Sequence, residues 1–160
     1  MTLAEESIPD GDLLSRFLIF PNSYEKESNE IAFEGFVTFE RDHQYGDSLV
    51  WRKYAPEDQD VHCHGLNAAE KKRERRMARN EADPDVRYTG FLSARAGEIR
   101  TIESAGIRLG VKHLPEEGRH HAGVYCIPYT SSKIKTSVRS DLKLKLYKLM
   151  ASALVSYEGI

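Results

Sequence analysis

The apolar residues of this chain fall mostly into short stretches in which every second residue is apolar, and several of these stretches end at proline or glycine. Ile107, Leu109 and Val111, for example, alternate with polar or small residues, and Pro115 closes the segment. Such alternation turns one face of a β-strand toward a core and the other toward solvent. It predicts strands at 31–39, 48–54, 86–92, 107–111 and 122–127. The apolar run at 13–20 is too short to separate strand from helix.

One amphipathic helix is predicted near the C-terminus, where Leu142, Leu146, Leu149 and Ala153 recur at helical spacing and Ser140 precedes them as the expected N-cap. Helices and strands do not alternate regularly along the chain. We therefore expect an α+β protein with a mostly antiparallel sheet of roughly five strands packed on this helix. The expected organisation is a flexible acidic tail at 1–11 and a single domain at 12–160.

Length and composition exclude several classes of protein. A chain of 160 residues, 40% hydrophobic and 30% charged, suits one globular domain rather than a disordered segment. No apolar run approaches a membrane span, and the N-terminal residues lack the features of a secretion signal. The two cysteines, Cys63 and Cys126, are too few for a disulfide framework. We expect a soluble cytoplasmic protein without a membrane partner, with Cys126 buried in a strand and Cys63 exposed.

Pro56 opens an acidic segment that is predicted to be a loop ending at Gly65. A second helix is predicted over 67–82, where Asn67 and Glu70 form a capping-box pattern and Asp83-Pro84 gives a stop signal. This helix has few apolar residues, so it should lie at the periphery of the domain. It is rich in lysine and arginine, as is the segment 133–148, although the formal net charge of the chain is only −2. If the two segments met in space, they would form one positive face.

Two interpretations of the basic segments stay open. Lysine, arginine and glutamate are good helix formers, so 67–82 could be an ordinary solvated helix. Alternatively, the chain is a non-catalytic interaction or regulatory module that binds an acidic protein or a nucleic acid, because arginine grips carboxylates and phosphates in bidentate fashion. Exchange of acidic and basic segments could also produce a homo-oligomer. The residues expected to bind the partner are Lys71, Lys72, Arg73, Arg75, Arg76, Arg79, Lys133 and Lys135.

The tripeptide His62-Cys63-His64 offers ligands for a metal ion. In an extended segment His62 and His64 would point the same way and could hold zinc, with His120 and His121 supplying the remaining ligands and Cys126 a sulfur donor. The spacing matches no standard zinc motif, and two unrelated histidine pairs are the competing explanation. No other cofactor is expected.

An alternative function is that of a small nuclease-like hydrolase. His120 or His121 would move protons while Arg119 stabilised charge on phosphorus, with or without a metal ion at His62 and His64. Adjacent residues on a strand point to opposite faces, so at most one of the two histidines could serve such a site. An ordinary solvated turn is the competing explanation, and the sequence leaves open whether the protein is an enzyme.

Overall fold

A computed structural model describes residues 4–20, 23, 31, 48–81, 84–127 and 134–157. Apart from Ile31, the expected strand at 31–39 lies outside the described residues, and so does Lys133. None of the helices in the described ranges is long and apolar enough to cross a membrane.

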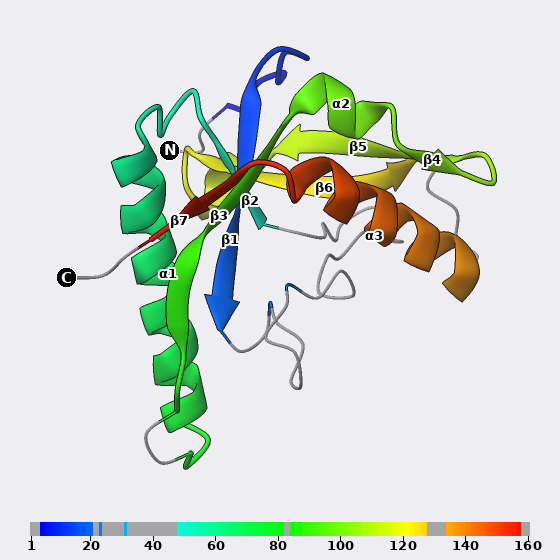
Figure 1. Ribbon diagram of the computed structural model, residues 1–160. Helices are drawn as coiled ribbons and strands as arrows, with labels where there is room; N and C mark the ends of the chain where they lie inside the picture. Colours follow the sequence, from blue (N-terminus) through cyan, green and yellow to red (C-terminus); the bar gives the residue numbers. More distant parts are fainter. Residues whose placement is uncertain are drawn as a thin grey trace.

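The described part of the chain forms a seven-stranded antiparallel sheet with three α-helices (Figure 1). The order of strands across the sheet is β4-β5-β6-β2-β1-β3-β7. The expected α+β class, single domain and mostly antiparallel sheet are therefore confirmed. The strands are β1 Leu13–Phe20, β2 Ser48–Trp51, β3 Arg87–Arg95, β4 Glu103–Ser104, β5 Ile107–His113, β6 His121–Ile127 and β7 Leu154–Ser156. The helices are α1 Asp58–Met77, α2 Ala96–Arg100 and α3 Thr136–Met150, and a short 3-10 turn covers Pro115–Glu117.

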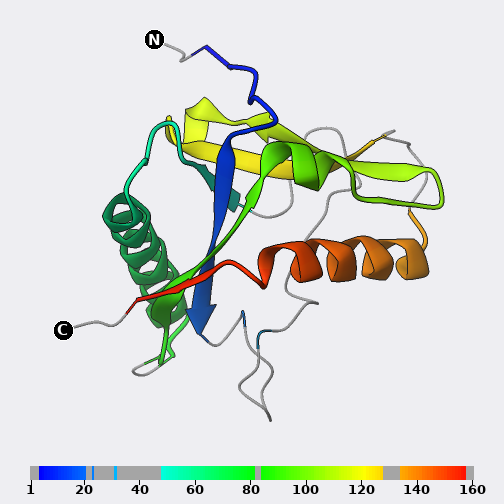
Figure 2. The ribbon, with the colours of Figure 1, turned by 45° about the horizontal axis from the view of Figure 1, so that its top comes forward.

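Helices α1 and α3 cover opposite faces of the sheet (Figures 1 and 2). Side chains of α3 enter the main core beside even-numbered β1 residues such as Leu14 and Leu18. Helix α1 instead packs against odd-numbered β1 residues, Phe17 and Ile19. Since neighbouring strand residues point to opposite faces, the two helices are separated by the sheet. The expected packing of the C-terminal helix on the sheet is confirmed. Its buried residues are Leu142, Leu146 and Met150.

Helix α1 begins nine residues earlier than the sequence analysis predicted. The segment before Asn67, expected to be a loop, forms its first two and a half turns. Glu57 is the N-cap, and its backbone N–H donates to Asp60 Oδ2 at 3.0 Å in a capping box. Acidic side chains in this first turn also complement the helix dipole. Gly65, which suggested a loop end, lies inside the helix. A glycine fits this position because a Cβ there would be 2.2 Å from the Tyr88 ring.

Other element boundaries also differ from the expectation. Helix α3 starts at Thr136, so Ser140 is not its N-cap, and it ends at Met150, before Ala153. The chain then forms strand β7, which pairs with β3. Strand β2 ends at Trp51 because the next residues turn, with the Tyr54 N–H donating to the Trp51 carbonyl.

Residues near the N-terminus contact the sheet. Ile8 is buried in the main core. The backbone N–H of Glu6 donates to Nδ1 of the buried His113 at 3.0 Å, and the Glu6 carboxylate accepts from Lys53 Nζ at 2.5 Å. The flexibility expected for residues 1–11 stays a prediction.

Candidate functional site

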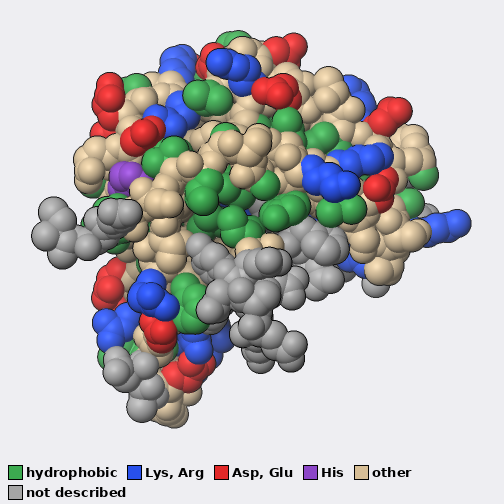
Figure 3. All heavy atoms as spheres, in the orientation of Figure 1, with side chains coloured by type: hydrophobic (Ala, Val, Ile, Leu, Met, Phe, Trp, Pro, Cys, Tyr) green, Lys and Arg blue, Asp and Glu red, His purple; other side chains and the backbone are tan. Residues whose placement is uncertain are grey.

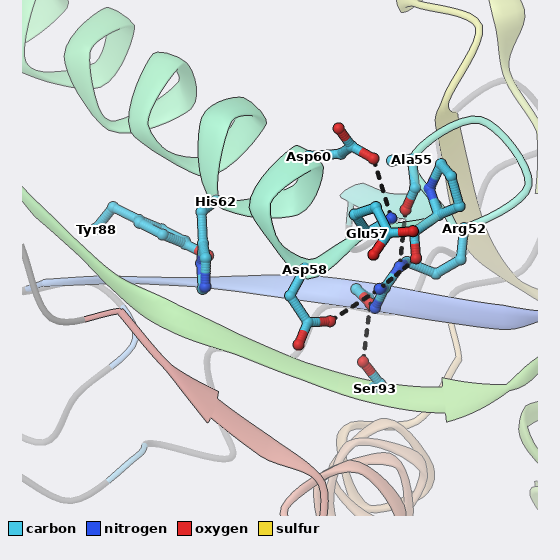
Figure 4. A network of polar contacts seen from close by, with 10 residues as sticks. Arg52, Ala55, Glu57, Asp58, Asp60, His62, Tyr88 and Ser93 are labelled. Atoms are coloured by element: carbon cyan, nitrogen blue, oxygen red, sulfur yellow. Dashed lines mark hydrogen bonds and ion pairs between the residues drawn. The ribbon is translucent and has the colours of Figure 1, made fainter.

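The junction between β2 and α1 is fixed by one arginine that the sequence analysis did not single out (Figure 4). Arg52 donates from Nε to the Ala55 carbonyl at 2.8 Å, and from Nη2 to the Pro56 carbonyl and Asp58 Oδ1, both at 2.9 Å. Its guanidinium lies 5.4 Å from the centroid of the Phe91 ring. A fourth hydrogen bond runs from Nη1 to the Ser15 hydroxyl on β1 at 3.4 Å. Arg52 therefore ties the start of α1 to the sheet.

His62 lies one turn further along α1, in an aromatic environment. Its Nδ1 is 2.7 Å from the hydroxyl of Tyr88, and the rings of Phe91 and Tyr157 pack beside it. Burial raises the pKa of Tyr88 well above its ordinary value, so this hydroxyl keeps its proton at neutral pH. The His62–Tyr88 pair therefore ties α1 to β3 and offers no ready nucleophile.

The arrangement expected for a metal at His62 and His64 is wrong, because these residues are helical rather than extended. Residues two apart on an α-helix point in nearly opposite directions. His62 accordingly faces Tyr88, while His64 stacks on His120. Within the described ranges, no group of three or more His, Cys, Asp or Glu side chains is arranged to hold a metal ion. Cys63 is exposed and Cys126 is buried, as expected.

The stacked pair His64–His120 joins α1 to the turn before β6. The ring centroids are 3.6 Å apart, with 18° between the planes. Burial, together with the neighbouring imidazoles of His64 and His121, lowers the pKa of His120 to about 4. His120 is therefore uncharged at neutral pH. One ring of the stacked contact belongs to the pair His62 and His64, and the other belongs to the pair His120 and His121.

The three residues of the hydrolase hypothesis do not converge on one point. His120 faces His64, whereas His121 Nδ1 lies 3.2 Å from Glu117 Oε2. The guanidinium of Arg119 lies over the Tyr54 ring at 5.4 Å. Burial lowers the pKa of His121 even though Glu117 opposes the shift.

The C-terminal half of α1 has a different character. Lys71 and Arg75 of α1, and Arg79 in the turn that follows it, are exposed and lie four residues apart in the chain. We call these three residues the cationic ridge. Arg73 and Arg76 are half-buried, and Arg76 pairs with Glu81 at 2.7 Å.

Lys72 lies beside the ridge in a strongly positive environment. Burial lowers its pKa, and three nearby arginines lower it further: Arg75, Arg16 and Arg76. Burial is the largest cause of this lowered pKa, and the arginine contribution to it comes from repulsion between like charges.

The second basic segment belongs to α3, on the opposite face of the sheet. Lys and Arg side chains accordingly gather in separate areas over the lower end of α1 and over α3 (Figure 3). On α3, Lys145 is engaged with Asp141 at 2.9 Å and with the Glu103 carbonyl at 2.6 Å, while Lys135 is exposed. The two basic segments do not form one positive face.

Comparison of the chain with protein-family models, with curated proteins and with solved structures finds no match.

Proposed function

We propose that this domain is a non-catalytic binding module that holds the phosphate backbone of a nucleic acid on the cationic ridge of α1. The observation that carries the proposal is the division of α1 into two halves. Val61, Gly65 and Ala69 are the buried residues of α1, and all belong to its first twelve positions. The remaining eight residues, 70–77, extend the helix by about 12 Å without a buried anchor.

Charge distribution on this half-helix supports the proposal. The ridge residues project from one side, and the acidic residues Glu70 and Glu74 follow a separate line along the helix. Lys72 is held next to arginines although this lowers its pKa. An anion bound here would relieve the repulsion between these cations, which gives binding an electrostatic driving force.

The regular spacing favours nucleic acid over an acidic protein. Four residues of α-helix rise about 6 Å, so Lys71 and Arg75 present positive charge about one turn apart, and Arg79 follows in the turn after the helix. Phosphates also repeat at a fixed interval along a strand, and arginine binds phosphate through two parallel hydrogen bonds. The basic residues of α3 lie on the other face and are not part of this surface.

Charge reversal on the two helices tests the proposal. The variant Lys71→Glu, Arg75→Glu, Arg79→Glu is compared with Lys135→Glu, Lys143→Glu, Lys148→Glu on α3, because both change the net charge equally. Binding to a fluorescent DNA duplex is measured by anisotropy at several salt concentrations. Three phosphate contacts predict that log of the binding constant falls with log of the salt concentration with a slope of about −2.7. This slope corresponds to roughly a 40-fold loss of affinity between about 50 and 200 mM salt.

We expect the ridge variant to lose most of this affinity and its salt dependence, and the α3 variant to bind nearly as the unmodified protein does. Equal losses in both variants would show that net charge, rather than the ridge, controls binding. A protein that binds no nucleic acid at low salt would refute the proposal and leave an acidic protein as the partner to seek.

A further inference from the structure

A groove of about 410 Å³ lies between α1 and β3, next to the basic half of the helix. Its apolar and aromatic lining includes Leu66 and Ala69 of α1, Tyr88 of β3 and Tyr157 just after β7. The two tyrosine rings are 5.4 Å apart and inclined by 44°. Leu66, on the same lining, is 38% exposed. The groove is therefore an accessible apolar hollow with an aromatic wall.

The groove is held by contacts that fix its shape. The Tyr157 backbone N–H donates to the Thr89 carbonyl at 2.9 Å, which positions this ring beside β3. The Tyr88 hydroxyl is bonded to His62, and Gly65 leaves room for the Tyr88 ring against the helix. A preformed hollow needs little reorganisation to take a ligand.

Polar groups lie at the rim of the groove. Glu70 supplies a carboxylate from α1, and Arg87 supplies a guanidinium that pairs with Asp85 at 2.8 Å. Leu66, Glu70 and Arg73 lie on the same side of α1, at positions i, i+4 and i+7. This side of the helix therefore passes from Leu66 through the acidic Glu70 to the half-buried Arg73, and the first ridge residue, Lys71, directly follows Glu70 in the chain.

We infer that this groove receives an unstacked nucleobase, so that the nucleic acid bound by the domain is single-stranded. The inference rests on the proposed function and specifies that the bound nucleic acid is single-stranded rather than double-stranded. A flat base offers a π-face to Tyr157 and hydrogen-bonding edges to the rim, while its phosphates reach the cations of α1. Aromatic stacking beside a positively charged surface is the common way in which proteins hold single strands. Within a duplex, the paired bases are not free to enter the groove.

The test compares a fluorescent mixed-sequence single strand of about twelve nucleotides with the duplex formed by the same strand. The variant Leu66→Trp fills the groove from an exposed position, and Met77→Trp, also exposed on α1 but outside the groove, is its control. Tyr157→Ala removes the aromatic wall, and Tyr157→Phe retains it. Thermal unfolding of each variant establishes that it is folded.

We expect the unmodified protein to prefer the single strand by about tenfold, as one stacked base would give. Leu66→Trp and Tyr157→Ala should abolish this preference without changing duplex binding, whereas Met77→Trp and Tyr157→Phe should keep it.

Equal affinity of the unmodified protein for both probes, or an undiminished preference in Leu66→Trp, would overturn the inference. The proposed function would still hold in that case if ridge reversal weakened binding of both probes. Absence of nucleic-acid binding altogether would overturn both, and the groove would then be a site for an apolar side chain of a protein partner.

Discussion

The stacked pair His64–His120 should make the stability of the domain depend on pH. The pKa of His120 is about 4 in the folded protein, against an ordinary value of 6.5. The folded state therefore favours the neutral imidazole, and the unfolded chain binds more protons between these two values. It follows that the free energy of unfolding falls as the pH drops from about 6.5 to about 4. A shift of this size corresponds to about 3 kcal/mol, which solvent screening of the half-buried ring reduces to about 1–2 kcal/mol.

His120→Phe isolates this contribution, because phenylalanine retains a ring against His64 but does not titrate. Urea unfolding would be followed by the fluorescence of Trp51, the single tryptophan of the chain, at several pH values between about 7 and about 4.5. We expect the unmodified protein to lose about 1–2 kcal/mol more than the variant over this interval. Parallel curves for the two proteins, or a His120 midpoint near 6.5 in an NMR titration, would contradict the reasoning.

Two further predictions concern helix α1. Gly65→Ala should destabilise the protein by about 1–2 kcal/mol in chemical denaturation, because the new Cβ would meet the Tyr88 ring, although alanine is the better helix former. The control is Gly11→Ala, where a new Cβ would have no atom within 4 Å, and it should change stability by less than about 0.5 kcal/mol. Arg52→Ala should cost about 2 kcal/mol and lower amide-exchange protection of the first turn of α1, since three hydrogen bonds are lost there. Unchanged stability in Gly65→Ala would mean that the Tyr88 ring can move aside, and unchanged protection in Arg52→Ala would mean that the capping box alone holds the helix start.

Most of the sheet could be predicted from the sequence because alternation is a local signal. The strands predicted at 107–111 and 122–127 correspond to β5 and β6, although the pairing of β3 with β1 shifts register next to Gly90, where Thr89 is skipped. The three-residue strand β7 was missed, because so short a segment has no measurable period. Ser140 resembles an N-cap, yet the N-cap of α3 is Lys135, five residues earlier, and Val138 in the added turn packs against the main core.

The candidate site was less predictable, since it depends on contacts between distant residues. The exposure of the basic half of α1 could be predicted from the sequence, because this segment has few apolar residues. By contrast, Pro56 and Gly65 indicated a loop, and the Glu57–Asp60 capping box that starts α1 uses acids rather than the usual serine or threonine. Nothing local in the sequence shows that His64 meets His120, 56 positions later, because this contact exists only once α1 has packed against the sheet.

The two shortest strands in the described part of the chain, β4 and β7, lie at the two edges of its sheet. An edge strand presents unpaired backbone groups to which another chain can add, and the number of such groups grows with strand length. With two residues at one edge and three at the other, this sheet offers little template for extension by a second copy. Addition of a second copy to either of these two edge strands should therefore be unfavourable.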